Sequence, residues 1–118
     1  MKVITTNDPY IAKSFRFFWI KRVYVGSVYR SLTPRQREAV VTHEVAHIGG
    51  HDTLWRMLAL LFPPVMPWLC RRQEFAADAF AKDRGYGPPL IEVLRTLPED
   101  CGWLYPKTSQ RIEKLLHN

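Results

Sequence analysis

A helix with a recognisable signal at each end lies in the segment LTPRQREAVVTHEVAHIGG, residues 32–50, and constrains the fold more than any other part of the sequence. Thr33 suits the N-cap, Pro34 suits the first helical position, and Gln36 completes a capping box with Thr33. One of the two closing glycines supplies the left-handed residue that ends many helices. The sequence therefore predicts one long helix to which the rest of the chain must be fitted.

Two strands and four more helices are predicted around this helix. The aromatic and β-branched run SFRFFWIKRVYVGS indicates two antiparallel strands, about residues 14–19 and 22–26, joined tightly near Lys21. Proline and glycine positions indicate helices from after Asp52 to Pro63, from about Pro67 to Gly85, over residues 88–97, and over residues 108–118 with Ile112, Leu115 and Leu116 on one stripe. We expect an α+β fold, mostly α-helical, with a small antiparallel N-terminal sheet and about five helices, in a single domain spanning residues 1–118.

The net charge of +6 is unevenly distributed along the chain. Residues 1–37 hold eight Lys or Arg against one acidic residue, Asp8, a net charge of +7, whereas residues 38–118 hold nine against ten, a net charge of −1. Such a basic segment can attract nucleic acid, anionic lipid or acidic substrates. Because no nucleic-acid-binding motif accompanies it, we interpret it as a solvated basic face and expect no nucleic-acid partner.

The most apolar segment is MLALLFPPVMPWLC, residues 57–70. Three prolines interrupt it, and it is shorter than the roughly 20 apolar residues that a membrane-spanning helix needs. The N-terminus MKVITTNDPY has no apolar core of a signal peptide, and the two cysteines, Cys70 and Cys101, form no CxxC pair. We therefore expect a cytoplasmic protein that does not span a membrane. The apolar segment could close a core, contact a membrane surface or bind a partner.

His43 and His47 lie four residues apart on the first helix, so their side chains project from the same face. Two imidazole nitrogens at this spacing can converge on one metal ion. Glu44 lies beside them, where it can take a proton from water activated by the ion. The sequence His43-Glu44-Val45-Ala46-His47 is the HExxH pattern of zinc hydrolases, which can also occur by chance on an amphipathic helix.

A third metal ligand is predicted on a later helix. Glu74 stands in the apolar run EFAADAFA, where a carboxylate is costly to bury unless a charged group pairs with it. Asp78 lies one turn later and can accept a proton from an imidazole N–H. The alternative is that both carboxylates form ion pairs with basic residues at helical spacing, namely Arg71, Arg72 or Lys82. The metal interpretation predicts one Zn²⁺ per chain, held by His43, His47 and Glu74.

These motifs resemble the gluzincin zinc metallopeptidases of the CAAX prenyl protease and HtpX type. HEVAHIGGHDTLW is similar to the active-site helix of that family, EFAADAFAKDRGYGPPLIEVLRTL to its third-ligand helix, and YPKTSQRIEKLL to its terminal segment. The similarity covers about residues 22–117, and the small minigluzincins are the nearest members in size. The sequence departs from the family in lacking its transmembrane helices and in having Tyr105 at the position of the family's histidine before proline.

The resemblance implies a minimal zincin-like catalytic domain with Glu44 as general base and a peptide or protein substrate. Tyr105 and Arg111 are candidates for stabilising the oxyanion, and His51 is a weaker one because the glycines before it should break the helical register. We interpret Cys70 as buried filler. One of the two N-terminal strands should be a sheet edge able to pair with an extended substrate.

Three hypotheses for the function follow. The first is a zinc-dependent endopeptidase, which could be latent if its own C-terminal tail blocks the cleft. The second is a zinc-stabilised regulatory or binding protein with little turnover. The third, based on the basic N-terminal segment and residues 57–70, is a protein associated with nucleic acid or with a membrane surface.

Overall fold

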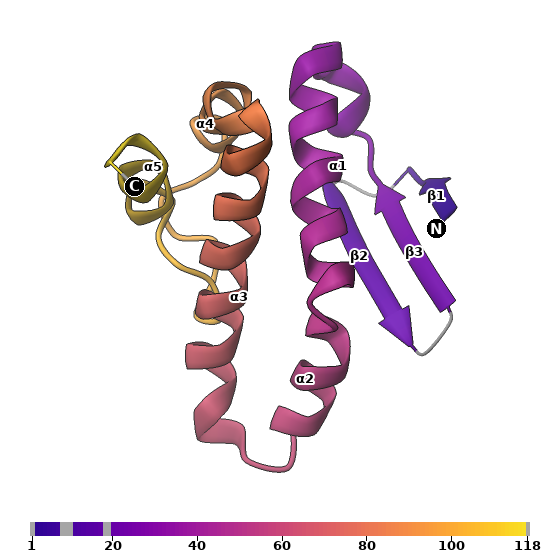
Figure 1. The fold of residues 1–118 in the computed structure, drawn as a ribbon, viewed down its shortest axis with the longest axis vertical. Helices are drawn as coiled ribbons and strands as arrows, with labels where there is room; N and C mark the ends of the chain where they lie inside the picture. The colour runs from indigo at the N-terminus through magenta and orange to yellow at the C-terminus, as the bar shows by residue number, and fades with distance from the viewer. Residues whose placement is uncertain (1, 8–10, 18–19, 118) are drawn as a thin grey trace.

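We analysed a computed structural model of the 118-residue chain, which describes residues 2–7, 11–17 and 20–117. Figure 1 shows helix α1 between a small sheet on one side and α3 on the other. The described elements are β1 (Lys2–Thr5), β2 (Ala12–Phe17), β3 (Ile20–Val25), a 3₁₀ turn (Tyr29–Ser31), α1 (Pro34–Gly49), α2 (Asp52–Ala59), a second 3₁₀ turn (Pro63–Val65), α3 (Met66–Ala81), a π turn (Lys82–Tyr86), α4 (Gly87–Leu94) and α5 (Thr108–His117). The predicted α+β, mostly helical fold is confirmed.

The sheet differs from the prediction because it has three strands and is mixed. Its strand order is β1-β3-β2, with β1 parallel and β2 antiparallel to β3. The sequence analysis missed β1, whose four residues are too few to show a clear alternation and whose pairing partner is distant in sequence. Lys21 lies inside β3, opposite Arg16, so the expectation that the strands join near Lys21 was wrong. Predicted strand residues 18 and 19 lie outside the described residues.

Helix α1 begins as predicted and ends differently. Thr33 Oγ1 accepts a hydrogen bond from the Gln36 backbone N–H at 3.2 Å, and the Gln36 side chain accepts one from the Thr33 N–H at 3.1 Å. At the other end Gly50 has right-handed backbone angles, and the left-handed residue is His51, with a φ of 57°. The predicted glycine stop was therefore wrong by one residue, because the turn into α2 places its positive φ after both glycines.

The remaining helices follow the predicted order with shorter bounds. α2 ends at Ala59, before Pro63, and α3 ends at Ala81 rather than Gly85 because the chain kinks in the π turn, where Gly85 has a φ of 86°. α4 ends at Leu94, three residues earlier than expected. On α5, Leu115 is buried but Leu116 is exposed, so the predicted stripe is narrower than expected.

Helix α1 is held by apolar packing on both sides. The larger cluster joins α1 to α3, α4 and α5, and the smaller one joins α1 to β3; their buried members are Ala39, Ala81, Leu90, Ile91, Leu94 and Leu115, and Val23, Val25 and Ile48, respectively. Packing on two sides fixes the rotation of α1, and therefore the direction in which its histidines point. None of the helices within the described residues is long and apolar enough to cross a membrane.

Candidate metal centre

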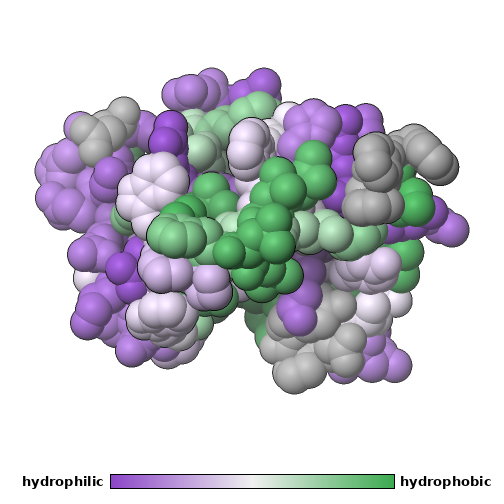
Figure 2. Space-filling view, turned by 90° about the horizontal axis from the view of Figure 1, so that it is seen from below, coloured by the Kyte–Doolittle hydropathy of each residue, from purple (hydrophilic) through white to green (hydrophobic). Residues whose placement is uncertain are grey.

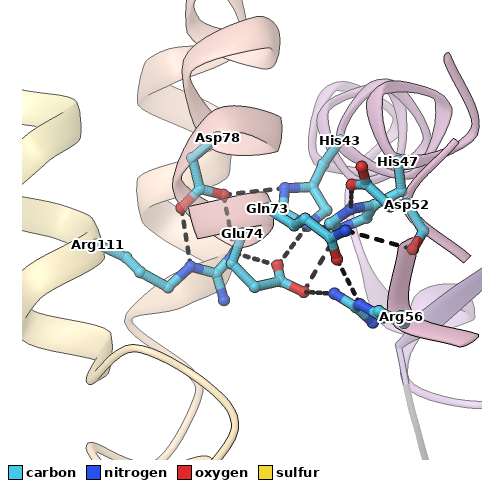
Figure 3. A network of polar contacts seen from close by, with 8 residues as sticks. All are labelled: His43, His47, Asp52, Arg56, Gln73, Glu74, Asp78 and Arg111. Atoms are coloured by element: carbon cyan, nitrogen blue, oxygen red, sulfur yellow. Dashed lines mark hydrogen bonds and ion pairs between the residues drawn. The ribbon is translucent and has the colours of Figure 1, made fainter. Parts of the chain in front are cut away.

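Three potential metal ligands meet between α1 and α3. Figure 3 shows His43 and His47 of α1 and Glu74 of α3 pointing toward one another. The Nε2 atoms of the two histidines are 3.2 Å apart; Nε2 of His43 lies 3.0 Å from Oε2 of Glu74, and Nε2 of His47 lies 3.4 Å from Oε1. All three residues are buried. The arrangement is a buried His-His-Glu group that could hold one metal ion.

The geometry and donor chemistry of this group fit zinc. Zinc bonds of about 2.0–2.1 Å in a tetrahedral arrangement separate neighbouring ligand atoms by about 3.3 Å, close to the three distances observed. The Nδ1 atoms of both histidines face carboxylates, which are acceptors, so with a metal bound each Nδ1 would carry a proton and each Nε2 would offer its lone pair to the ion.

Two aspartates orient the histidines through these Nδ1 atoms. Nδ1 of His47 donates to Oδ2 of Asp52 at 2.6 Å. Nδ1 of His43 lies 2.9 Å from Oδ1 of Asp78, although the two groups are not aligned for a full hydrogen bond. Carboxylates in this position fix the ring and make the other nitrogen a better metal ligand.

Asp78 is in turn held by Arg111 of α5. Nε and Nη2 of Arg111 donate to the two oxygens of Asp78, each at 2.8 Å, and Nη2 also lies 3.7 Å from Oε2 of Glu74. Within the described residues, the arginines that pair with Glu74 and Asp78 are therefore Arg56 and Arg111, both from other helices. The alternative pairs with basic neighbours on α3 itself do not form; Arg71, for example, donates instead to the Trp103 carbonyl at 2.8 Å.

The buried histidines and carboxylates of this cluster shift one another's pKa values. Burial alone would lower the pKa of His43, but the nearby carboxylates of Asp78 and Glu74 outweigh it and raise that pKa to about 10. Burial would raise the pKa of Glu74, yet the hydrogen bonds from His43 and His47 hold it well below its usual value. In the absence of a metal, the carboxylates around the two imidazoles therefore favour their positively charged form.

Glu44 lies beside the metal group and faces a cleft of about 670 Å³. Its side chain is buried, with 8% of the residue exposed, and it forms no hydrogen bond or ion pair with any residue that the structure describes. The cleft has one wall from β2, including Ala12 and Ser14, and an opposite wall from α4, including Leu90 and Val93. A carboxylate that is enclosed and without a charged partner can accept a proton from a molecule in this cleft.

Of the other predicted site residues, some line the cleft and others do not. Tyr105 lines the cleft, and burial raises the pKa of its hydroxyl, which keeps it a donor at neutral pH. Arg111 also lines the cleft, with its guanidinium occupied by Asp78. His51 is exposed and outside the described lining of the cleft, and Cys70 is buried.

The sequence analysis missed three polar residues on the far side of Glu74. Nε of Arg56 donates to Oε1 of Gln73 at 2.5 Å, Nε2 of Gln73 donates to the Asp52 carbonyl at 3.2 Å, and Nη2 of Arg56 lies 3.5 Å from Oε1 of Glu74. The sequence feature that could have indicated Arg56 and Gln73 is their polarity next to apolar residues. Arg56 directly precedes the apolar segment 57–70, and Gln73 directly precedes Glu74. Asp52 was identifiable only as an acidic residue directly after the helix stop.

Comparison with known proteins shows a structural relative. No protein-family model matches the sequence, and no curated protein does. The fold is similar to the crystal structure of S. mikatae Ste24p, with a TM-score of 0.64 at 17% sequence identity over 88% of this chain. The chain spans only 41% of the length of that protein. At this identity the similarity extends to the fold.

Proposed function

We propose that the protein is a zinc-dependent endopeptidase of the gluzincin type, with zinc held by His43, His47 and Glu74. The observation that carries the proposal is the convergence of two buried imidazoles and a buried carboxylate beside a buried Glu44 that faces the cleft. The two Nε2 atoms are 3.2 Å apart, and each lies 3.0 to 3.4 Å from one oxygen of Glu74. The sequence similarity to the CAAX prenyl protease and HtpX type and the similarity in fold to Ste24p support it.

The residues of the chain divide the proposed chemistry between them. Zinc, when bound, supplies a Lewis acid and lowers the pKa of water at the site. Glu44 takes the proton of the attacking water and delivers it to the departing amine. Tyr105, at the edge of the cleft, donates a hydrogen bond to the oxyanion that develops on the scissile carbonyl. Arg111 acts as a positioning residue because its guanidinium is committed to Asp78, which orients His43.

The free edge of β2 is the proposed binding surface for the substrate backbone. β2 is an edge strand, and the backbone N–H of Arg16 points away from β3 and donates to Oγ1 of Thr53 at 3.3 Å. Because backbone groups alternate along an antiparallel strand, those of Ser14 point the same way, into the cleft that Ser14 lines. An extended peptide can therefore add to β2 and pass between the sheet and Glu44.

The test compares the wild type with Glu44→Gln and Glu38→Gln in the hydrolysis of an unfolded protein substrate, with zinc content measured in each sample. Glu38 is on the same helix but exposed, near Arg35, and serves as the matched control. We expect one zinc per chain in all three, and activity in the wild type and in Glu38→Gln only. Equal activity of Glu44→Gln would refute the mechanism. Bound zinc without turnover in the wild type would favour the regulatory or binding role.

A further inference from the structure

The end of the α2–α3 hairpin carries a concentrated apolar surface. Figure 2, which views the molecule from below, shows apolar side chains gathered at the centre of this face with hydrophilic ones around them. Leu61, at the turn between the helices, is 84% exposed, and Phe62 is 63% exposed. We call this surface the apolar tip; its exposed large residues are Leu54, Trp55, Met57, Leu58, Leu60, Leu61, Phe62 and Trp68.

Helix α2 contributes little to the apolar core, and most of its large apolar side chains are exposed. Of the eight residues of α2, only Ala59 is a buried apolar residue, whereas four large apolar residues of the helix are exposed. Exposed apolar surface on this scale is rare on a protein surface that has no partner. We therefore take the apolar tip to be a contact surface.

The charge around the tip indicates which partner covers it. Residues 53–73 contain three arginines and no Asp or Glu. Arg71 and Arg72 are exposed on α3, directly after the apolar part of the hairpin, and the Arg72 guanidinium lies 5.3 Å from the centre of the Trp68 ring. An apolar protrusion with arginines at its base and no acidic residues is complementary to a surface with an apolar interior and negatively charged headgroups.

The sheet extends the basic charge to the side of the tip. Arg16 of β2 contacts Thr53 of α2 through its backbone, so this end of the sheet lies next to the hairpin. Lys21 pairs in register with Arg16, and Arg22 follows it on β3. These residues belong to the N-terminal segment whose net charge is +7.

The aromatic residues of the region are those that favour a membrane interface. Trp55 and Trp68 are exposed within the tip, and exposed Trp103 is joined to its base by the hydrogen bond from Arg71. Tryptophan concentrates at the level of lipid headgroups because its ring is apolar while its N–H needs a polar partner.

We propose that the apolar tip inserts into the surface of an anionic phospholipid membrane, with Arg71 and Arg72 at the headgroups. Leu61 and Phe62, at the most exposed point, enter the acyl region. The candidate metal centre is then held close to the lipid surface, because α2, which begins at Asp52 and ends directly before Leu60 of the tip, is only about 12 Å long.

The test measures co-sedimentation with vesicles of phosphatidylcholine alone and of phosphatidylcholine mixed with phosphatidylglycerol. The variants are Leu61→Glu/Phe62→Glu at the tip and Leu116→Glu, an exposed leucine on α5, as the matched control. We expect the wild type and Leu116→Glu to bind the anionic vesicles, the tip variant to bind at least about tenfold more weakly, and added salt to weaken wild-type binding. Circular dichroism and thermal unfolding establish that each variant is folded.

Two outcomes would overturn the proposal. One is a failure of the vesicle test: either the wild type does not bind anionic vesicles, or the tip variant binds them as well as the wild type does. The other is a wild-type dimer in lipid-free sedimentation that the tip variant converts to a monomer while vesicle binding is absent, which would assign the tip to a second copy of the chain. Quenching of tryptophan fluorescence by brominated lipids in the wild type, lost in the tip variant, would support insertion.

Discussion

Asp52 reaches His47 across a turn that has room for it only because residue 50 is glycine. A Cβ built on Gly50 would lie 2.8 Å from Oδ1 of Asp52, and the other oxygen of that carboxylate holds Nδ1 of His47 at 2.6 Å. The flexible carboxylate could move away from a larger residue 50, but it would then leave the imidazole. The orientation of one metal ligand therefore depends on two neighbours that are not ligands.

We predict that Asp52→Asn weakens zinc binding by about 10- to 100-fold, because the amide orients the ring less well and no longer makes Nε2 of His47 more basic. Competition with a chromophoric chelator measures the affinity. Asp83→Asn, a change at an exposed acid in the π turn, is the control and should bind zinc as the wild type does. An unchanged affinity in Asp52→Asn would show that the contact does not tune the site.

His51 is the one described residue other than glycine with a positive φ. A left-handed conformation costs an ordinary residue about 1 kcal/mol and glycine almost nothing. We predict that His51→Gly raises the free energy of unfolding by up to about 1 kcal/mol, measured by urea denaturation, and leaves zinc content unchanged. A loss of zinc in this variant would instead make His51 part of the metal site.

The sequence brought out the three candidate metal ligands, which the structure places together, better than the residues that orient them. His43, His47 and Glu74 follow from helical spacing and from the cost of a carboxylate in an apolar run, both of which are local features. Asp52 and Arg56 lie after the break at His51, where the chain changes direction between α1 and α2, and a left-handed non-glycine residue has no clear sequence signal. The partner of Asp78, Arg111, is 33 residues away, and only its family-type position suggested a role.

At the level of elements, β2 is the part of the fold whose proposed role is easiest to isolate. We predict that Ser14→Pro lowers kcat/KM for a peptide substrate by about tenfold or more, because proline removes the N–H that faces the cleft. An edge strand tolerates proline at a position that points away from its neighbour. Ser14→Ala keeps the N–H and should retain full activity.

Ser14→Pro and Ser14→Ala are compared by steady-state kinetics on the same peptide, with circular dichroism to verify the sheet. If both variants hydrolyse the peptide equally well, the substrate does not pair with β2. If Ser14→Pro loses its sheet signal, the proline has acted on the fold, and alkylation of the Ser14 backbone nitrogen by chemical synthesis would take its place.

Elements with local signals were predicted, and elements that depend on distant pairing were not. The Thr33 and Gln36 side chains form their capping box within four residues, so the start of α1 was correct. β1 pairs in parallel with β3 about 20 residues later, for example Val3 with Val23, and no local pattern specifies such a partner. The end of α3 was also missed. The residues directly before Gly85 continue the helical sequence pattern, although in the structure they form a π turn.

At the scale of the whole molecule, zinc binding should contribute to stability. The proposed ion joins α1 to α3. In its absence the two buried Nε2 atoms lie 3.2 Å apart, and each lies within 3.4 Å of one oxygen of the buried Glu74 carboxylate. Zinc at about 100 times its dissociation constant adds about 2.7 kcal/mol, which corresponds to a rise in Tm of roughly 10 °C for a chain of this size. Thermal unfolding with excess chelator and with zinc measures the difference.

Glu74→Gln is the control for that measurement, since it keeps the shape of the side chain and removes its charge. We expect zinc to raise the Tm of this variant much less than that of the wild type. An equal rise in both would place the ion at another site on the protein.

The two hydrogen bonds between Arg111 and Asp78 connect the last helix to the metal site. Asp78 touches His43 on one side and binds the guanidinium of α5 on the other, so an event at either contact changes the balance at the other. Coupling of this kind is reciprocal. If metal binding stabilises the packing of α5 on α3, then a protein that binds α5 and separates it from α3 weakens metal binding by the same free energy. Helix α5 would then be an allosteric site at which another molecule could inhibit the metal centre.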